Sequence, residues 1–249
     1  MKLSIITATY NSAATLADTL ECIQNQDHPD IEHIIIDGGS TDDTINIIKK
    51  YSHISRFVSE KDNGIYDAMN KGIAIAGGDI IGILNSDDVY ASPDILSLVA
   101  QTFEEHPQAM ALYADLQFVQ RDDMSKVVRS WKAGRYTKSS FYYGWMPPHP
   151  TFFVRREVYD TVGAFNINLG SAADYELMLR ILLKHNIKAT YINKVIIKMR
   201  VGGVSTGSLK NRIKANRQDR MAWKINNLKP FPFTLYLKPM RKLGQFFIK

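Results

Sequence analysis

The 249-residue chain has few of the features that mark secreted or membrane-spanning proteins. Its one cysteine, Cys22, cannot form an intrachain disulfide or a cysteine-based zinc site. No run of about 18 consecutive apolar residues occurs, so no transmembrane helix is expected. The apolar stretch that begins at Leu3 is interrupted by Thr7, Thr9 and Asn11 before a signal-peptide core could form. These absences predict a cytoplasmic location.

The sequence also lacks the common glycine-rich and nucleophile motifs. No G-x-G-x-x-G follows the first expected strand and no Walker A motif occurs, which argues against dinucleotide and P-loop sites. G-x-S-x-G is absent too, which argues against a serine hydrolase. A bound phosphate would therefore be held by a metal ion rather than by a glycine loop.

Charge is unevenly distributed along the chain. Residues 210–249 contain eleven Lys and Arg against one Asp, a net charge of +10. The whole chain carries +6, so residues 1–209 carry −4. Any binding to a polyanion is therefore expected of the C-terminal segment alone.

Apolar runs of strand length alternate with helical spacing over the first 110 residues. This alternation predicts an α/β fold, with parallel strands and right-handed crossovers in a Rossmann-like half sheet. The expected strands are 3–8, 31–36, 56–59 and 79–84, and the expected helices are 16–23, 41–48, 66–76 and one with Pro93 at its first position. Beyond them, strands are expected at 109–119, 126–131, 151–154 and 189–201, a loop at 134–150 and a helix at 175–185.

Acidic residues follow the fourth expected strand. Ligands of such sheets bind beyond the carboxyl ends of the strands. Asp87 and Asp88 lie there, and two adjacent carboxylates can hold Mg²⁺ or Mn²⁺, which would bridge to substrate phosphates. The alternative is that Ser86 or Asp88 only caps the following turn.

Three further residues could contact a nucleotide. Asp37 ends an apolar strand, and it either accepts a hydrogen bond from a base or ribose or caps the helix that begins near Thr41. Asp67 and Lys71 lie one helical turn apart, and they either contact the nucleotide or form an exposed ion pair.

Two residues of the second half are candidates for chemistry on the acceptor. Asp174 enters a helix and is either a general base or a helix cap; Glu176 would point elsewhere and ranks second. His149 lies between two prolines in an aromatic loop, and it either contacts the acceptor or diphosphate or has a structural role.

Four segments carry a resemblance to a known family. They are Ser4–Asn11 (SIITATYN), Ile36–Asp42 (IDGGSTD), Asn63–Gly72 (NGIYDAMNKG) and Leu84–Asp88 (LNSDD). Their order and spacing resemble those of family 2 glycosyltransferases with the GT-A fold, of the type found in bacterial exopolysaccharide, colanic-acid or O-antigen assembly. The resemblance covers residues 1–205 and implies a nucleotide-sugar-binding half (1–110), an acceptor-binding half (111–205) and a C-terminal extension (206–249).

The resemblance also implies roles for individual residues. It assigns Thr7, the Ala8 backbone and Tyr10 to the base pocket, Asp37 to the base or ribose, Asp67 and Lys71 to the nucleotide segment, Asp87 to the metal and Asp174 to the catalytic base. The expected cofactor is Mn²⁺ or Mg²⁺, and the expected donor is UDP-, GDP- or dTDP-linked.

Three departures from the family pattern matter. Asn85 replaces the first carboxylate of the D-x-D motif, which leaves Asp87 and Asp88 to hold the cation. Ala173 replaces the usual Glu before Asp174. The Q-x-x-R-W motif of processive synthases is missing, which favours the addition of a single sugar. A base and a leaving group on opposite faces of the sugar imply inversion at the anomeric carbon.

The C-terminal segment combines basic and apolar residues. Residues 210–226 have a basic helical pattern, and residues 233–249 mix aromatic residues with Lys and Arg. This composition suits an amphipathic segment on an anionic membrane, on the inner face of the cytoplasmic membrane, where a polyprenyl-linked glycan acceptor would be found. The alternatives are a helix that packs on the core or an oligomer interface. No nucleic-acid-binding module is present, so no nucleic-acid partner is expected.

Two other functions compete with the transferase. A nucleotidyltransferase that makes nucleotide sugars should carry a Gly- and Arg-rich loop after the first strand, and residues 7–12 contain neither amino acid. A non-catalytic, membrane-docked subunit that binds nucleotide sugar is compatible with Asn85 and Ala173.

Overall fold

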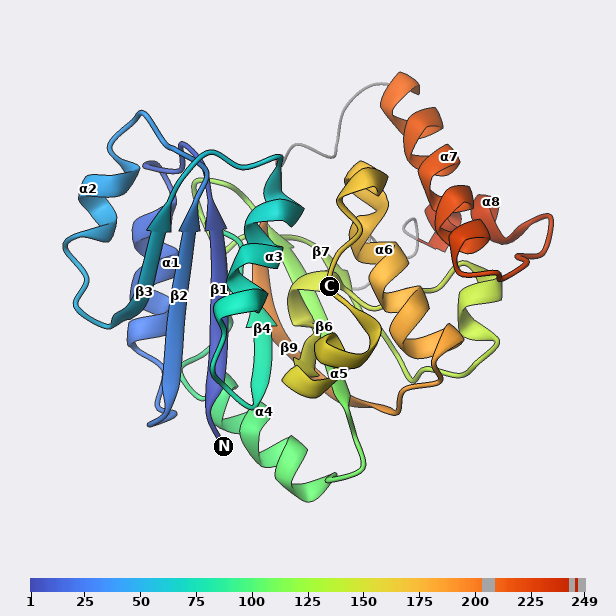
Figure 1. The fold of residues 1–249 in the computed structure, drawn as a ribbon, viewed down its shortest axis with the longest axis horizontal. Helices are drawn as coiled ribbons and strands as arrows, with labels where there is room; N and C mark the ends of the chain where they lie inside the picture. The colour runs from blue at the N-terminus through green and yellow to red at the C-terminus, as the bar shows by residue number, and fades with distance from the viewer. Residues whose placement is uncertain (203–208, 242–244, 246–249) are drawn as a thin grey trace.

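The structure is a computed structural model that describes residues 1–202, 209–241 and 245, with side chains in the second range from residue 215 onward. Its core is a mixed nine-stranded sheet with helices on both faces (Figure 1). The strand order is β3-β2-β1-β4-β8-β6-β9-β5, and β7 pairs with β6. The strands are β1 (Leu3–Thr9), β2 (Ile31–Asp37), β3 (Ile54–Ser59), β4 (Ile80–Ile83), β5 (Asp88–Tyr90), β6 (Ala111–Val119), β7 (Val127–Trp131), β8 (Phe153–Arg155) and β9 (Ala189–Arg200).

The first half is the parallel α/β unit that the apolar pattern predicts. β1 pairs in parallel with β2 and β4, and β2 pairs in parallel with β3. The connecting helices are α1 (Leu16–Gln24), α2 (Thr44–Ile48) and α3 (Ile65–Ile75). Helix α4 (Ile95–Glu105) has Asp94 at its N-cap, so Pro93 precedes the helix and does not take its first position as predicted.

The second half makes the sheet mixed. The short strand β8 joins β4 to β6 by antiparallel pairing on both sides, and β6 and β9 form a long parallel pair. Two elements were not predicted: β5, which pairs antiparallel with β9, and helix α5 (Arg156–Val162). The helix expected at 175–185 is two elements, α6 (Ala173–Met178) and a π-helical segment, η4 (Leu179–Lys184).

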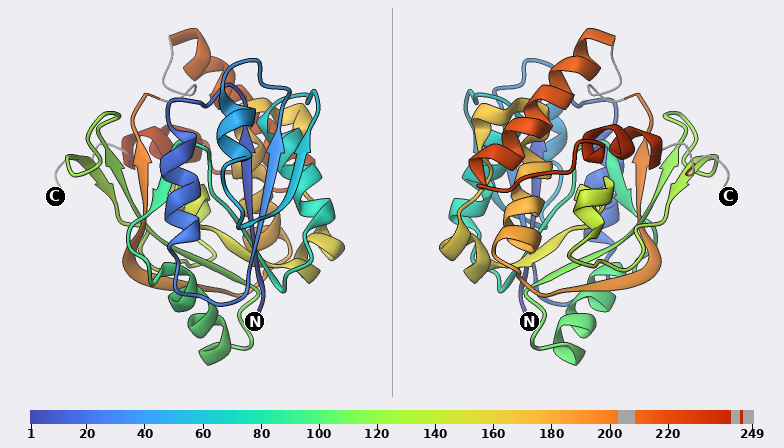
Figure 2. Two further views of the ribbon diagram at one scale, coloured as in Figure 1. Left: turned by 90° about the vertical axis from the view of Figure 1, so that its left-hand side faces the viewer. Right: turned by 90° about the vertical axis from the view of Figure 1, so that its right-hand side faces the viewer.

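Strand β1 is buried on both faces, as a central strand of an α/β sheet must be. Ile6 belongs to the core cluster that includes α3 and α6, whereas Ile5 belongs to the cluster that includes α4. Figure 2 shows α1 and α3 on opposite faces of the parallel strands. A Cβ atom on Gly72 of α3 would lie 2.4 Å from Ile6 Cγ2, so glycine at this position lets α3 approach β1 closely.

The C-terminal extension packs on the core. It contains α7 (Leu209–Ile225) and α8 (Thr234–Arg241). Trp223 is fully buried, and Thr234 Oγ1 donates a hydrogen bond of 2.6 Å to the Tyr142 carbonyl. Figure 2 shows α7 lying alongside α6. Of the alternatives considered for the C-terminal segment, a helix that packs on the core is therefore correct for the inner face of α7 and α8. The predicted boundary at 205/206 lies outside the described residues, as does most of the predicted membrane segment after Arg241.

The outer face of α7 remains exposed. It carries Arg217, Arg220 and Lys224 together with Met221 and Ile225. The mixture of basic and apolar side chains that the sequence predicts for this segment is thus present on one face of the helix. Within residues 1–202 and 209–241, no helix is both long and apolar enough to span a bilayer.

A pair of histidines links β1, β2 and the start of β3. His33 is fully buried, its Nε2 lies 3.1 Å from Thr7 Oγ1, and its Nδ1 lies 3.0 Å from His53 Nε2. Burial lowers the pKa of His33 to about 3, and the neighbouring His53 adds to the effect. His33 is therefore neutral in the folded protein over the physiological pH range.

Acidification is expected to destabilise the protein through His33. The unfolded chain protonates this residue near pH 6.5 and the folded chain only near pH 3, so stability falls as the pH drops below 6.5. Between about pH 7.5 and pH 5.5 this one residue should remove about 1.4 kcal/mol of unfolding free energy. Urea denaturation of wild type, His33→Gln and the exposed control His185→Gln measures the effect. Equal pH dependence in all three would contradict the assignment to His33.

Candidate active site

The loops that follow β1, β2 and β4 are hydrogen-bonded into one unit. Asn11 adopts a left-handed backbone conformation (φ 48°), and its N–H donates to Ser40 Oγ at 2.8 Å. Asn11 Oδ1 accepts from the Thr41 N–H at 2.9 Å. Ser12 Oγ lies 2.9 Å from Ser86 Oγ, which joins the third loop. The polar segments after the three parallel strands therefore meet at one edge of the sheet, as predicted.

Asp37 lies at the end of β2 and is fully buried. Its Oδ2 accepts hydrogen bonds from the N–H groups of Gly39 (3.1 Å) and Ser40 (3.0 Å) and from Ser59 Oγ (2.7 Å). Its Oδ1 accepts from Ser40 Oγ. The carboxylate thus organises the loop after β2. This structural role is similar to the helix-cap role that the sequence left open for Asp37. A contact with a base or ribose stays a prediction.

The predicted base-pocket residues differ in accessibility. Thr7 and Ala8 are buried within β1, and Thr7 Oγ1 is paired with His33. Tyr10 is 61% exposed. Its ring borders Gly38, since a Cβ there would lie 3.4 Å from Tyr10 Cδ2. Of the three side chains, only that of Tyr10 is free to pack against a base.

Asp67 and Lys71 form contacts with their own neighbourhood at the start of α3. Lys71 Nζ lies 2.7 Å from Glu60 Oε1 and 3.7 Å from Asp67 Oδ2. The hydrogen bond with Glu60 raises the pKa of Lys71. Asp67 Oδ2 also accepts from the Asn63 N–H at 2.9 Å. These contacts resemble the ion-pair alternative, and a role in nucleotide binding stays a prediction.

Asp88 is a buried carboxylate with an incomplete set of partners. Its Oδ2 accepts from Asn85 Nδ2 at 2.8 Å. Its Oδ1 and the Oδ1 of Asn85 are both buried and find no hydrogen-bond partner among the described residues. Burial raises the pKa of Asp88 to about 8, and the negative charge of Asp87 adds to the effect. Unpaired buried oxygens of this kind are costly unless something else satisfies them.

The backbone around these acidic residues is fixed from outside. Arg200 Nη1 donates to the Asp87 carbonyl at 2.9 Å, and Thr19 Oγ1 donates to the Asp88 carbonyl at 2.9 Å. Among the described side chains, no group of three or more His, Cys, Asp or Glu could hold a metal ion on its own. Asp87, Asp88 and the Asn85 amide oxygen therefore offer a partial set of oxygen ligands.

Asp174 lies in the first turn of α6 and is half-buried. The N-cap of this helix is Ala172, so Asp174 is not the cap, and its Oδ1 accepts from the Tyr175 N–H at 2.6 Å. Its charge acts on Tyr66 of α3, where burial and then Asp174 raise the phenol pKa. It also acts on His149, where it opposes the lowering of the pKa by burial. The fold therefore places Asp174, Tyr66 and His149 in one region, and a role of Asp174 and His149 in chemistry on the acceptor stays a prediction.

Tyr66 and Asn70 belong to this cluster, and the sequence analysis did not identify either of them as a site residue. Tyr66 packs against Phe165 (ring centroids 5.2 Å apart), and His149 meets the same ring edge-on at 5.5 Å. Asn70 Nδ2 donates to the Phe165 carbonyl and Asn70 Oδ1 accepts from the Phe165 N–H, both at 2.9 Å. Both Tyr66 and Asn70 lie in the Asn63–Gly72 segment, so their signal was present, but only the fold shows that they face Asp174 and Phe165.

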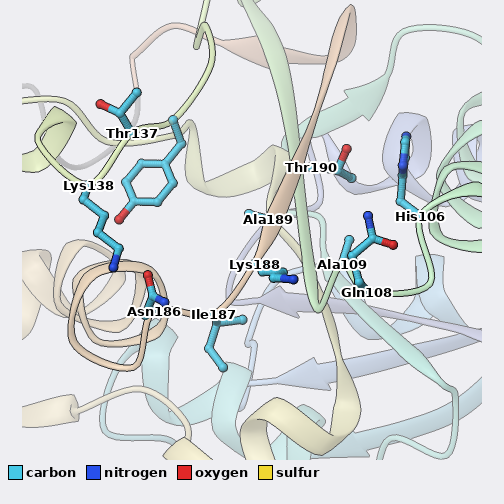
Figure 3. A pocket seen from close by; sticks show the side chains of 11 residues that line it. His106, Gln108, Ala109, Thr137, Lys138, Asn186, Ile187, Lys188, Ala189 and Thr190 are labelled. Atoms are coloured by element: carbon cyan, nitrogen blue, oxygen red, sulfur yellow. The ribbon is translucent and has the colours of Figure 1, made fainter.

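A separate cavity of about 440 Å³ lies at the other edge of the sheet (Figure 3). It is bordered by the residues that lead into β6 and β9, among them Gln108, Ala109, Lys188 and Ala189. None of the predicted site residues lines it.

Comparison with known proteins decides the family. The family model described as "Glycosyl transferase family 2" matches residues 4–163. The chain belongs to glycosyl transferase family 2. It is also 30% identical over 211 residues to the "PGL/p-HBAD biosynthesis glycosyltransferase" of Mycobacterium tuberculosis, a match that covers 81% of this chain and 78% of the relative. Chondroitin synthase of Escherichia coli is 27% identical over 206 residues, or 82% of this chain and 29% of that protein.

Solved structures show the same fold. The structure of S. aureus TarS 1-349 in complex with UDP superposes with a TM-score of 0.70 at 21% identity, over 98% of this chain and 72% of that one. The mannosyltransferase PcManGT from Pyrobaculum calidifontis, in complex with GDP-Man and Mn²⁺, gives 0.66 at 21% identity, over 98% and 70%. The fold of this family 2 member is GT-A, and the protein is a glycosyltransferase, so the nucleotidyltransferase and non-catalytic alternatives are not supported.

If Asp37 organises the loop, Asp37→Asn should destabilise the protein without any nucleotide. An amide would face donors that now bind a carboxylate, at an expected cost of about 1–3 kcal/mol of unfolding free energy. Ser59→Ala, which removes one of those donors, should cost about 1 kcal/mol. Urea denaturation measures both. An Asp37→Asn protein as stable as wild type but weaker in nucleotide binding would instead favour a direct contact.

Proposed function

We propose that this family 2 member moves a single sugar from a nucleotide sugar to a hydroxyl of a lipid-linked glycan, with inversion at the anomeric carbon. The observation that carries the proposal is the cluster at Asp174. Asp174 is half-buried in the first turn of α6, in the second half of the chain. Its charge acts on Tyr66 and His149, whose rings both pack against Phe165. The acidic segment Asp87–Asp88 follows β4 in the first half.

The donor is a nucleoside diphosphate sugar, UDP-, GDP- or dTDP-linked. Support comes from the linked loops after β1, β2 and β4, which present Tyr10 beside Gly38. It comes also from the fold neighbours, since TarS structures contain UDP or UDP-GlcNAc and PcManGT contains GDP-Man. Thr7, Ala8, Asp37, Asp67 and Lys71 would shape this site, mostly by holding its loops in place.

The oxygens after β4 fit a divalent cation, Mn²⁺ or Mg²⁺. Asp87 would bind it, and Asp88 would supply a second negative charge, with substrate phosphates completing the ligand set. The unpartnered oxygens of Asp88 and Asn85 and the raised pKa of Asp88 are the features that a cation would relieve. When bound, a divalent cation offsets the charge that develops on the leaving diphosphate.

Asp174 accepts the proton of the attacking hydroxyl. An alcohol is a poor nucleophile at neutral pH, so a positioned base is needed as the bond to the sugar forms. His149 and Tyr66 border the same carboxylate and help to place the acceptor. Attack from the face opposite the leaving diphosphate gives inversion in one displacement, with no covalent intermediate.

The acceptor side faces an anionic membrane at the cytoplasmic surface. The outer face of α7 presents Arg217, Arg220 and Lys224 beside Met221 and Ile225. Further exposed aromatic and methionine side chains lie in η1 (Ser140–Tyr143), in the segment between α7 and α8, and in α8: Tyr143, Phe231, Phe233, Tyr236 and Met240. Basic groups with apolar neighbours suit the headgroup region of a bilayer.

Two variants separate donor binding from chemistry. In Asp87→Ala, stabilisation by a nucleoside diphosphate with Mn²⁺ should be lost; in wild type, ligand at a hundredfold excess over its Kd adds about 2.7 kcal/mol. In Asp174→Asn, that stabilisation should persist while turnover falls by about 10²- to 10⁴-fold. Thermal shift with UDP, GDP and dTDP, with and without Mn²⁺, and a transfer assay measure these effects. Full turnover in Asp174→Asn would refute its role as the base.

Membrane docking predicts a specific loss of binding to anionic vesicles. Each basic residue near such a surface adds about 1 kcal/mol, so Arg220→Gln/Lys224→Gln should weaken binding by about thirtyfold. The matched control is Lys49→Gln/Lys50→Gln, which removes two exposed charges next to α2. Sedimentation with phosphatidylglycerol vesicles compares the two. An equal loss in both variants would show that only net charge matters.

A further inference from the structure

Helix α7 contacts the chain on both sides of Asp174. Helix α6 (Ala173–Met178) follows a 3-10 segment, η3 (Ile167–Ala172), and continues directly into the π-helical segment η4 (Leu179–Lys184), so Asp174 lies near the N-terminal end of a helix. The next inference rests on the proposed role of Asp174 as the base. Asp174 lies in the first turn of its helix, so its position depends on the residues that pack against that turn.

After Asp174, the contacts begin at Tyr175. Its side chain is buried, and its hydroxyl accepts a hydrogen bond of 2.9 Å from Trp223 Nε1 of α7. Lys238 Nζ of α8 lies 3.5 Å from the centre of the Tyr175 ring. The same ammonium group donates to both carboxylate oxygens of Asp219 in α7 at 2.8 Å. Tyr175 is therefore fixed at its hydroxyl and at its ring face.

The next residue, Glu176, is held in the same way. Its buried carboxylate accepts from Asn226 Nδ2 at 2.9 Å and from Arg180 Nε at 2.9 Å. Arg180 Nη2 also donates to the Ala164 carbonyl at 2.6 Å. Ala164 precedes Phe165, whose ring contacts Tyr66 and His149. One network therefore joins α7 to the aromatic residues around Asp174.

Before Asp174, the contact is made by Gln218. Gly170 has a backbone conformation outside the helical region (φ 48°, ψ −127°). A Cβ atom on it would lie 2.7 Å from Gln218 Nε2, and Ser171 Oγ lies 3.1 Å from Gln218 Oε1. Gln218 and Trp223 of α7, together with Asn226 directly after it, thus contact residues 170–176.

We propose that Trp223 is a positioning residue for Asp174, and that α7 is part of the active site rather than a tail. Within the described part of the chain, the polar and ring contacts of Trp223 are with Tyr175 and Tyr142, not with Asp174 or a group proposed to bind donor. Trp223 fixes Tyr175, which is the next residue along the chain and whose N–H donates to the Asp174 carboxylate. Loss of the indole N–H should let the first turn of α6 shift. The rate of transfer should then fall, because it depends steeply on the position of the base relative to the acceptor hydroxyl.

The test is a double-mutant cycle on one hydrogen bond. Trp223→Phe removes the donor and Tyr175→Phe removes the acceptor, while each keeps an aromatic ring. Each variant should lower kcat roughly five- to tenfold, the range for one buried hydrogen bond, with KM for the nucleotide sugar and nucleotide affinity within about twofold of wild type. The double variant should fall no further, because both changes remove the same bond.

Trp145→Phe is the matched control. Trp145 is buried, and its Nε1 donates to the Ala133 carbonyl at 2.7 Å, so the variant loses a comparable bond elsewhere. Its kcat should stay within about twofold of wild type at a temperature where all variants are folded. Unchanged kcat in Trp223→Phe, or equal losses in Trp223→Phe and Trp145→Phe, would overturn the proposal. If Asp174→Asn itself retains turnover, the proposed function fails instead, and the two results are distinguishable.

Discussion

The parallel pairing of β1 with β2 and β4 is the constraint on which the site depends. It brings the loops after three strands to one edge, where Asn11, Ser40 and Ser86 connect them. The pairing in turn requires β1 to be buried on both faces, and the close approach of α3 at Gly72 covers one of them. A polar site of this kind stays in register only while the apolar strand beneath it is packed.

Most polar side chains of the donor edge serve the loops before any ligand arrives. Asp37, Asp67 and Lys71 all have partners within the chain. Asp88 and Asn85 differ, because each keeps a buried oxygen without a described partner. Buried polar groups are usually satisfied, so these two unpartnered oxygens are the observation on which the proposed cation site rests. This distinction depends on which hydrogen bonds each side chain forms, and a sequence motif does not reveal them.

Sequence reasoning predicted the parallel half-sheet well. Strands of a parallel sheet are buried on both faces, so they appear in the sequence as continuous apolar runs such as Leu3–Ala8. The same reasoning missed the short strand β5, which depends on a long-range partner in β9, and the strand it expected at 151–154 begins two residues before the start of β8. Asp174 and His149 were each predicted as candidates for chemistry on the acceptor, but the sequence did not show that they lie in the same region. The proximity of Tyr66 to Asp174 and of Trp223 to Tyr175 could not be predicted, because the segments that carry these residues are far apart in the sequence.

The contact of the C-terminal helices with two glycines has an evolutionary consequence. Gly144 and Gly170 both have positive φ, and a Cβ at either would collide with the extension, at Lys238 N (2.4 Å) or at Gln218 Nε2 (2.7 Å). A side chain at Gly144 would collide with the backbone of α8, and a side chain at Gly170 would displace the Gln218 side chain of α7. The inner face of the extension and the part of the domain beneath it therefore constrain each other's sequence through direct contact, whereas residues on the outer face are not constrained by this contact.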